Sequence, residues 1–569
     1  MKTKKHFGDY TDAELMKMNP KDLIKIIKSF QMEDNFITMT DSYKQTHHLL
    51  LPDDLKEVYS YMEPRGGEMP YTVSVLLQYY AKRYLVGCRI TPEKIEEARD
   101  MNIKHFGFDC FNDELWQYIV KVHGGKLPLE IKAVPEGTPV AVKNIIMSMR
   151  NTDPRCAALT NPTETLLMKL WASNTVATYA RVVRTLILKY HLLSSDAPQY
   201  LVNFMHHDFG YRGVSSEESA RILGAAGLSS GFLGTDTLGA IKLCRDYYNE
   251  DMAGFSVIAS EHSVTCCWGS RLAEPEAYLQ MIEKVKKKCM NANPPSKVII
   301  VSLVSDTYNI YNVCYRILPH LQSHFIGWTN NFGCTIKIVV RPDSGTPTDV
   351  LFGYRFEGAE FFDLSNKLSE DINKLYPDNQ ITKETARELV RKGVFGILFD
   401  AFGFSINSKG FKVLHPQIGV LQGDGISLPV IQELFDRMIS LKYDTMNLVV
   451  GSGGKYLQSH ERDDQKYAIK CTHIIRNLSG QAVEKNPITD SGKKSKIGYL
   501  KLVKTGPTWR DYRTASSLLD ADFDQLKDEL VPIFLNGELV KEYDFTDIRK
   551  NSDIEPWEYT VDKKELELV

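Results

Sequence analysis

The feature that most restricts the fold of this chain is a series of short β-rich runs separated by helical stretches, from about residue 200 to 450. Apolar strands that alternate with amphipathic helices are typical of a parallel sheet. The predicted strands are 200–204, 255–259, 297–304, 335–340, 418–421 and 446–450. Six such units favour an irregular (β/α) barrel over a doubly wound sheet, so the predicted fold class is α/β.

Local patterns support helices between these runs. Ser215 and Ser216 before Glu217 and Glu218 fit a capping box at a helix start. Another helix is indicated by apolar residues at 3.6-residue spacing, namely Ile431, Leu434, Phe435, Met438 and Leu441.

The N-terminal part has a different pattern, and 569 residues exceed one ordinary domain. Strands at 57–61 and 130–134 and a helix at 92–106, capped by Thr91 with Pro92 as its first residue, predict an α+β domain with an antiparallel sheet. The predicted division is a charged extension (1–30), the α+β domain (31–160, joined by part of the C-terminal chain), the barrel (161–500, with an insertion at about 355–410) and a C-terminal segment (501–569).

Composition excludes several classes of protein. A formal charge of −3 gives no support to nucleic-acid or membrane-surface binding. The ten cysteines form no CxxC pair and no zinc-ligand spacing, which indicates reduced thiols. The sequence shows neither a secretory signal nor an apolar run of about 18 residues. We therefore expect a cytoplasmic protein without nucleic-acid or membrane partners.

Polar residues follow each predicted strand of the barrel. In parallel α/β folds the carboxyl ends of the strands meet at one mouth, where ligands bind. The residues expected there are His207-Asp208-Phe209-Gly210-Tyr211-Arg212, Glu261-His262, Ser305-Asp306, Arg341-Pro342-Asp343-Ser344-Gly345, Gln422-Gly423-Asp424-Gly425 and Gly451-Ser452-Gly453-Gly454. The sequence thus predicts a ligand site at this mouth.

Residue types suggest the ligand, with a structural alternative for each. The glycine run 451–454 suits a phosphate, or is an ordinary turn. Asp343 and Asp424 suit ribose hydroxyls or a metal, or are turn residues. Arg212 and Arg341 suit phosphates, or form ordinary ion pairs.

The remaining candidate residues likewise have both a functional and a structural interpretation. His262, beside Glu261, is a catalytic or a structural histidine, and Phe209 stacks on an aromatic base or packs in the core. A late basic series is either a solvated surface or, with Arg65, a pyrophosphate site: Arg462, Lys470, Lys485, Lys493, Lys494 and Lys496. Together they suggest a phosphorylated sugar substrate and an aromatic partner.

These segments, in this order, resemble the nicotinamide phosphoribosyltransferase family from about residue 36 to 551. The matching strings include Thr40-Asp41-Ser42-Tyr43-Lys44, Ile131-Lys132-Ala133-Val134-Pro135-Glu136-Gly137, Asn151-Thr152-Asp153-Pro154, His207-Asp208-Phe209-Gly210-Tyr211-Arg212-Gly213, Gly234-Thr235-Asp236-Thr237, Glu261-His262-Ser263 and the barrel-end motifs above.

The resemblance implies a fold, a reaction and partners. The fold would be that of type II phosphoribosyltransferases, an irregular α/β barrel with an additional α+β domain, in a homodimer with shared active sites. The reaction would convert nicotinamide and phosphoribosyl pyrophosphate to nicotinamide mononucleotide and pyrophosphate, with Mg²⁺, in NAD salvage. ATP would act as an activating co-substrate that phosphorylates His262.

The resemblance also implies roles for single residues, while the metal ligands stay unassigned. The catalytic set would be His262, Asp343, Asp306 and Glu261, with Glu261 or Asp306 fixing the tautomer of His262. The substrate-binding set would be Asp41, Tyr43, Phe209, Arg212, Asp236, Ser256, Arg341, Gly423, Asp424, Gly453 and Gly454. Within it, Phe209 and a partner subunit's Tyr43 would enclose the pyridine ring, and Asp236 would accept from the carboxamide. Arg65, Arg462, Lys470 and Lys485 would bind pyrophosphate.

The sequence departs from the family pattern at several positions, and two rival functions are weighed against the prediction. The extension 1–30 and the segment 355–410 are additional, and Met205, Lys455 and Ala468 replace residues usual in the family. One rival is a nicotinate phosphoribosyltransferase, which is disfavoured because anionic Asp236 would repel a carboxylate. The other is a catalytically silent nucleotide-binding regulator, which is disfavoured because His262 and the strand-end acids are present.

Overall fold

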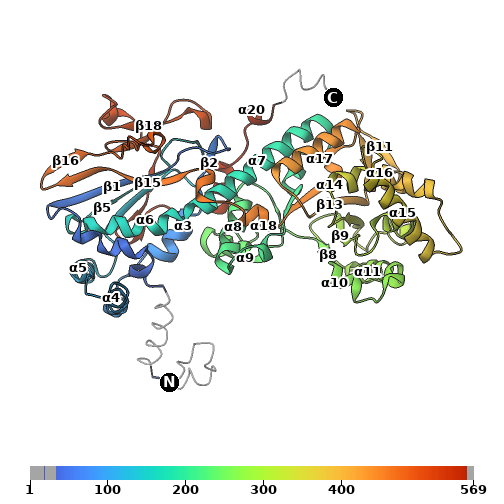
Figure 1. Cartoon of the computed structure of the whole chain (residues 1–569), viewed down its shortest axis with the longest axis horizontal. Helices are drawn as coiled ribbons and strands as arrows, with labels where there is room; N and C mark the ends of the chain where they lie inside the picture. The colour runs from blue at the N-terminus through green and yellow to red at the C-terminus, as the bar shows by residue number, and fades with distance from the viewer. Residues whose placement is uncertain (1–17, 20–33, 561–569) are drawn as a thin grey trace. The chain divides into compact units, whose positions relative to one another are not determined.

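A computed structural model describes residues 18–19 and 34–560, so nearly all of the predicted extension 1–30 lies outside the described residues. The chain divides into two compact units (Figure 1). Unit 1 contains the chain up to Thr178 together with Glu461–Asn551, and unit 2 contains Tyr179–His460 and the residues from Ser552 onward. Each unit is thus built from two separate stretches of the chain.

Unit 1 contains an antiparallel sheet of order β16-β15-β1-β5-β3-β19-β20. Its strands are β1 (Leu55–Pro64), β3 (Leu129–Ala133), β5 (Met147–Asn151), β15 (Tyr467–Arg476), β16 (Ser479–Ala482), β19 (Val531–Leu535) and β20 (Glu538–Leu539). β15 pairs with β1 along its length, from Leu55 opposite Arg476 to Pro64 opposite Tyr467. Residues 461–500, expected in the barrel, therefore belong to the α+β unit, because their strands complete its sheet.

Helices and two small strand pairs complete unit 1. They are α3 (Leu77–Tyr80), α4 (Pro92–Phe106), α5 (Asp113–His123), α6 (Thr160–Met168) and α19 (Phe545–Asn551), with β2 (Tyr71–Val73) beside β4 (Pro139–Ala141) and β17 (Leu500–Lys504) beside β18 (Tyr512–Ser516). The side chain of Thr91 accepts from the Lys94 N–H at 3.4 Å, which confirms the predicted cap of α4. The long helix α7 (Leu170–Ser194) crosses the boundary in sequence between the units.

Unit 2 contains a parallel sheet of order β7-β6-β14-β13-β10-β9-β8. The strands are β6 (His206–Asp208), β7 (Gly234–Thr235), β8 (Ile258–Ala259), β9 (Val298–Val304), β10 (Thr335–Arg341), β13 (Ile418–Gln422) and β14 (Leu448–Ser452). Phe255, just before β8, joins the two edges: its N–H donates to the Leu233 carbonyl (2.7 Å) and its carbonyl accepts from the Thr235 N–H (3.0 Å). The predicted irregular (β/α) barrel is confirmed.

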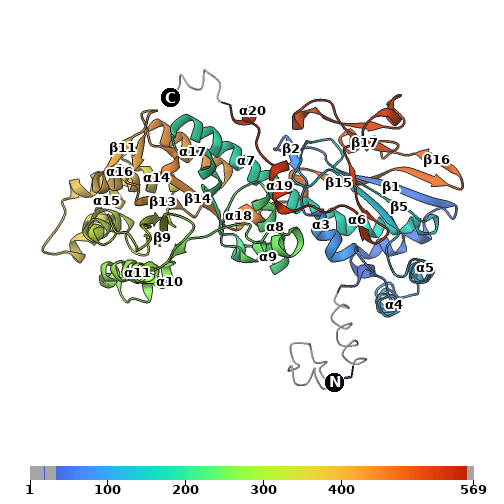
Figure 2. The same cartoon turned by 180° about the vertical axis from the view of Figure 1, so that it is seen from behind.

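Helices surround these strands, with α8 and α9 on one side and α15 and α16 on the other (Figure 2). They are α8 (Glu217–Ser229), α9 (Leu238–Tyr248), α10 (His262–Cys266), α11 (Glu274–Cys289), α12 (Ile310–Asn312), α13 (Leu318–Leu321), α14 (Pro347–Phe352), α15 (Ala359–Leu375), α16 (Lys383–Phe402), α17 (Leu428–Ser440), α18 (Gly454–Gln458) and α20 (Pro556–Tyr559); β11 (Phe404–Ile406) and β12 (Lys412–Leu414) form a hairpin. α17 buries Ile431, Leu434, Phe435 and Met438, as predicted. In the part of the chain that is described, no helix is long and apolar enough to cross a bilayer.

Three strands start two or more residues later than the apolar pattern predicts. Residues 200–204 form part of a 3₁₀ turn (Gln199–Phe204), and the strand is the polar His206–Asp208. This polar strand is stable inside the barrel because its side chains are paired: His206 lies 2.9 Å from Ser452 Oγ, and Asp208 accepts from Thr235 Oγ1 at 3.1 Å. Likewise β14 begins at Leu448 rather than 446, and β8 covers only the end of 255–259.

Candidate active site

The aromatic ring of Phe209 lies just beyond β6. Its centroid is 4.6 Å from that of His207, and its backbone N–H donates to the Ser452 carbonyl at 2.9 Å. The ring also covers Gly451, where an added Cβ would lie 2.2 Å from Phe209 Cε2. Only glycine allows this close approach, so Gly451 creates the place that Phe209 occupies.

Asp236 follows β7 and presents a charged carboxylate beside this ring pair. Its Oδ1 lies 2.9 Å from His207 Nε2 and accepts from Ser256 Oγ at 2.5 Å. Burial alone would raise the pKa of Asp236, but these hydrogen bonds and the interactions with His207 and Arg341 outweigh it and lower that pKa. Asp236 is therefore an anionic acceptor in the mouth of the barrel.

His262 is the first residue of α10, and its imidazole is 46% exposed. Nδ1 lies 3.1 Å from Thr307 Oγ1, while Nε2 faces Asp343 Oδ2 at 3.5 Å and Asp306 Oδ1 at 3.9 Å. The structure thus brings His262, Asp306 and Asp343 together from three strand ends.

The partner of His262 Nδ1 is neither Glu261 nor Asp306, the two residues expected to fix the tautomer. Glu261 accepts from Ser263 Oγ at 2.5 Å and lies 3.6 Å from the exposed Arg212, so its contacts do not orient His262. Thr307, which the sequence analysis missed, takes that position. Its one signal was its place in the chain, a hydroxyl residue directly after Asp306 at a strand end.

Several buried polar atoms at the strand ends have no hydrogen-bond partner among the described residues. They are Asp306 Oδ1, Arg341 Nε and Gln422 Oε1, at the ends of β9, β10 and β13. The other Asp306 oxygen is saturated, because it accepts from the Asp343 N–H (2.9 Å) and Ser344 Oγ (2.5 Å). Unpaired buried polar atoms are costly, so they point to a polar ligand at this mouth.

Glycines bring two backbone segments close together at the opposite side of the mouth. A Cβ on Gly213 would lie 2.5 Å from Gly454 Cα, whereas one on Gly453 would meet nothing within 4 Å. A Cβ on Gly423 would lie 3.3 Å from Asp343 Oδ1, and Asp424 beside it is exposed. The backbone at Gly453 is therefore open to a ligand.

The six other predicted site residues belong to unit 1. Tyr43 is 57% exposed, and Asp41 next to it is exposed as well. The four predicted pyrophosphate residues are Arg65, Arg462, Lys470 and Lys485. Burial lowers the pKa of Lys470, Glu164 opposes this effect, and the positive charges of Arg65, Lys485 and Arg462 lower the pKa further. The four cations therefore belong to one electrostatic cluster, which also contains the Glu164 carboxylate.

Comparison with known proteins decides the family. The model described as "Nicotinamide phosphoribosyltransferase, N-terminal domain" matches residues 35–131, and that of the "Nicotinate phosphoribosyltransferase (NAPRTase) family" matches 204–526. A nicotinamide phosphoribosyltransferase of Xanthomonas campestris pv. campestris is 34% identical over 526 residues, which are 91% of this chain and 98% of the relative. One of Acinetobacter baylyi is 31% identical over 548 residues, 91% of this chain and 96% of the relative. This chain belongs to the nicotinamide phosphoribosyltransferase family.

Solved structures agree with this family at the level of the fold. Nicotinate-nucleotide pyrophosphorylase from Pyrococcus furiosus superposes with a TM-score of 0.50 at 14% identity, over 91% of this chain and 95% of that chain. A barrel closed by Phe255 and an α+β unit completed by C-terminal strands are thus the type II phosphoribosyltransferase fold.

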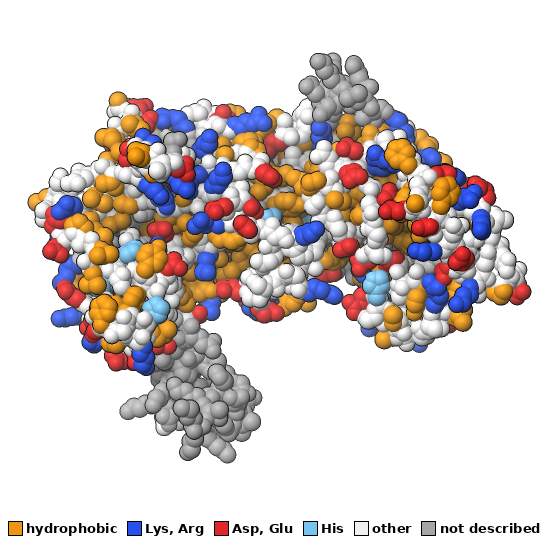
Figure 3. All heavy atoms as spheres, viewed as in Figure 1, with side chains coloured by type: hydrophobic (Ala, Val, Ile, Leu, Met, Phe, Trp, Pro, Cys, Tyr) orange, Lys and Arg blue, Asp and Glu red, His pale blue; other side chains and the backbone are white. Residues whose placement is uncertain are grey.

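Charged side chains of both signs are interspersed over the visible faces of both units (Figure 3). The cationic cluster of unit 1 is therefore a local concentration of positive charge and not part of a surface that is basic throughout.

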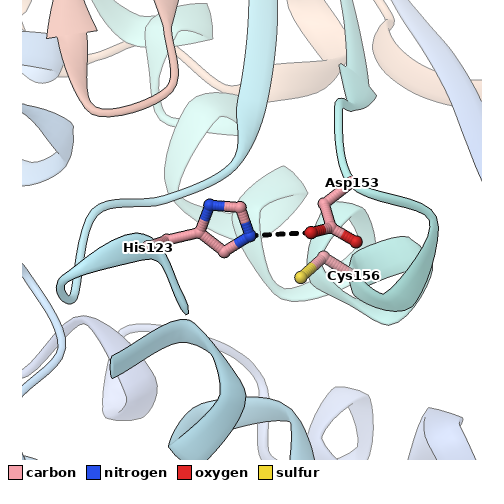
Figure 4. Close-up of side chains that lie close together, drawn as sticks. All are labelled: His123, Asp153 and Cys156. Carbon is pink, nitrogen blue, oxygen red and sulfur yellow. Dashed lines mark hydrogen bonds and ion pairs between the residues drawn. The ribbon is translucent and has the colours of Figure 1, made fainter. Parts of the chain in front are cut away.

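His123, Asp153 and Cys156 form a second close group, in unit 1 (Figure 4). Asp153 Oδ2 lies 2.8 Å from His123 Nε2 and accepts from the Tyr118 hydroxyl at 2.9 Å, while Oδ1 accepts from the Arg155 N–H at 2.8 Å. Burial raises the pKa of the Cys156 thiol to about 12. We interpret the group as a hydrogen-bonded junction between α5 and the turn that follows β5.

Proposed function

We propose that this chain converts nicotinamide and phosphoribosyl pyrophosphate to nicotinamide mononucleotide and pyrophosphate, in NAD salvage. The observation that carries the proposal is the anionic Asp236, held by His207 and Ser256 beside the ring of Phe209. A carboxamide NH₂ donates to such a carboxylate, whereas the carboxylate of nicotinate is repelled by it.

The remaining groups suit the transfer itself. The pyridine nitrogen forms a bond to the anomeric carbon of the ribose while the bond from that carbon to the pyrophosphate oxygen breaks. Phe209 orients the ring, and Asp343 and Asp424 accept from the ribose hydroxyls. In this proposal the 5′-phosphate binds against the backbone of Gly453 and Gly454, and the open space beside Gly453 supports this. In this proposal the cluster around Lys470 stabilises the departing pyrophosphate.

The acids near His262 fit a divalent cation. Asp306 offers a buried oxygen without a partner and Asp343 offers a second carboxylate, and such oxygens are the ligands that Mg²⁺ prefers. These two residues would hold Mg²⁺, which when bound neutralises charge on the pyrophosphate.

His262 is the proposed acceptor of the ATP γ-phosphate. When Nδ1 carries its proton and donates to Thr307, the lone pair of the exposed Nε2 is free to attack phosphorus. The N–P bond forms as the bond to ADP breaks, and hydrolysis of the phosphohistidine then returns the free imidazole. ATP would stimulate the synthesis through this cycle.

The test is product identification with the purified chain, Mg²⁺, phosphoribosyl pyrophosphate and either nicotinamide or nicotinate. We expect nicotinamide mononucleotide, with kcat/KM for nicotinamide about 100-fold or more above that for nicotinate. A preference for nicotinate would establish the rival phosphoribosyltransferase. Failure of both bases to react would favour the silent regulator.

A further inference from the structure

A residue of α15, in the added segment 355–410, contacts both loops that carry the catalytic candidates. Asp371 Oδ1 pairs with Arg271 Nη1, and Asp371 Oδ2 accepts from Asn309 Nδ2 at 2.6 Å. Arg271 lies on the segment that follows α10, the helix that His262 begins, and Asn309 lies three residues after Asp306. A single carboxylate from the added segment thus bridges the two loops that carry His262 and Asp306.

These two loops are also joined to each other. The Tyr308 hydroxyl donates to the Gly269 carbonyl at 3.3 Å, and the Arg271 guanidinium lies over the Tyr308 ring, 5.6 Å from its centroid. The next residue toward the site, Thr307, contacts His262 Nδ1 at 3.1 Å. The chain of contacts from Asp371 to the imidazole is therefore continuous.

Helix α15 is well placed to act as a fixed support. Its side chains Phe361, Leu368 and Ile372 are buried. Just after the helix, Tyr376 accepts from Asn312 Nδ2 at 3.4 Å, and Arg316 lies over the Tyr376 ring at 4.6 Å. Asp371 thus stands on an element anchored on the same stretch of chain, 309–316, that follows the Asp306 loop.

We propose that Asp371 is a positioning residue that directs His262 Nε2 toward Asp306 and Asp343. The added segment thereby acts on the reaction from outside the barrel. The effect of this positioning on the use of ATP rests on the proposed function.

The physical reason is that the Asp371 carboxylate pairs with the Arg271 guanidinium and accepts from the Asn309 amide at the same time. Its side chain is only 18% exposed, so this pairing is better shielded from water than a surface ion pair. Without it both loops lose their shared anchor, and a displacement of about 1 Å at a reacting group costs roughly 100-fold in rate. Binding of nicotinamide should change little, because Phe209 and Asp236 are held by β6, β7 and β14.

The experiment compares Asp371→Ala with Glu357→Gln in the full chain. Glu357→Gln breaks the Arg391–Glu357 ion pair (2.6 Å) in the same segment but touches neither catalytic loop. The measurements are transfer of label from γ-labelled ATP to His262, kcat and KM for nicotinamide, and the rate at which diethylpyrocarbonate modifies His262, with exposed His320 as the internal reference.

For Asp371→Ala we expect labelling and ATP-stimulated kcat to fall about 10- to 100-fold, with KM for nicotinamide within about twofold. Modification of His262 should change severalfold relative to His320, and Asp371→Glu should recover part of each effect. Glu357→Gln should match the wild type.

Three outcomes would contradict part of this picture. Unchanged modification of His262 in Asp371→Ala would overturn the positioning role, whatever the labelling shows. If the wild type takes no label but Asp371→Ala still shows the expected change in modification of His262, the phosphohistidine is refuted and the positioning role stays supported. An equal drop in thermal midpoint and activity in both variants would mean that the segment acts through stability alone, against the proposal.

Discussion

Two carboxylates on neighbouring strands of the barrel mouth have opposite environments. Burial raises the pKa of Asp208, although the Gly210 N–H donates to it at 2.7 Å and Thr235 Oγ1 at 3.1 Å. Asp236 is held by His207 and Ser256, and its pKa is lowered. Burial therefore disfavours the negative charge of Asp208, whereas the partners of Asp236 stabilise its negative charge.

Replacing Asp236 tests that charge directly. Asp236→Ser removes both the acceptor for a carboxamide and the repulsion of a carboxylate, so kcat/KM for nicotinamide should fall about 10- to 100-fold and the preference over nicotinate should shrink. Steady-state kinetics with both bases measure the ratio. If the ratio of the two kcat/KM values stays at its wild-type value, Asp236 does not select the base.

His262 offers a chemical test of ATP use. His262→Ala should abolish ATPase activity and ATP stimulation while the thermal midpoint stays close to that of the wild type, because the imidazole is half exposed. Incubation with γ-labelled ATP should give an acid-labile, base-stable label on the wild type only. Equal labelling of both proteins would refute the assignment, and a large loss of stability would indicate a structural histidine instead.

Glu274 at the start of α11 predicts a pH dependence of stability. It is 2% exposed, one of its oxygens has no partner among the described residues, and burial raises its pKa from 4.5 to about 8. The unfolded chain releases this proton near pH 4.5 and the folded chain only near 8, so the free energy of unfolding falls as the pH rises between these values, by about 1.4 kcal/mol per pH unit.

Glu274→Gln should remove this slope, since the amide resembles the protonated acid, and should leave the variant more stable than the wild type at about pH 7.5. Thermal midpoints at several pH values measure it. Glu276→Gln, at an exposed position of the same helix, is the control and should keep the wild-type slope. Parallel curves for wild type and Glu274→Gln would show that Glu274 ionises normally.

At the scale of elements, β14 joins the two ends of the mouth that we propose bind the base and the 5′-phosphate. It pairs with β6 at Gly451–His207 and Ser452–Asp208, so Phe209 emerges beside its last residues. The strand thus places Gly451 under the aromatic ring and leaves Gly453 open, although the two glycines are only two residues apart.

The two glycines should respond differently to alanine. In Gly451→Ala the new Cβ must displace the Phe209 ring, so KM for nicotinamide should rise about tenfold and stability should drop by about 1–3 kcal/mol. Gly453→Ala has room for its methyl group, so stability should persist while KM for phosphoribosyl pyrophosphate rises. Kinetics and denaturant unfolding of both variants measure this. The same kinetic change in both would contradict separate roles.

At the scale of the whole molecule, the predicted site residues divide between two structural units. Tyr43 and the cluster around Lys470 lie in unit 1, and His262, Asp306 and Asp343 lie in unit 2. We propose that a homodimer completes each site, with Tyr43 supplied by one subunit and the barrel by the other.

Mixing two inactive variants tests such sharing. Tyr43→Ala and His262→Ala subunits, combined in one heterodimer, would form one intact site of the two and should recover up to about half of the wild-type activity per dimer. Tagged subunits purified in tandem establish the heterodimer. Heterodimers that stay inactive would show that each site belongs to one subunit.

Short-range patterns in the sequence determined several strands and helices of this protein. Some elements depend on residues only a few positions apart, and these are the strands β9, β10 and β13, the buried face of α17 and the cap at Thr91. Hydrophobic periodicity and helix capping act over such short distances, so they can be recognised in the sequence directly. The motifs at the strand ends likewise located the polar mouth, because parallel strands end at one edge of a sheet.

Only the tertiary structure decided the rest. The polar strand β6 is stable because Ser452 and Thr235, distant in the chain, satisfy its side chains. Phe255 closes the barrel, β15 joins β1, and Thr307 rather than Glu261 contacts His262. The bridge made by Asp371 joins residues 62 and 100 positions away. Each depends on which distant groups the fold brings into contact, and no local pattern encodes that.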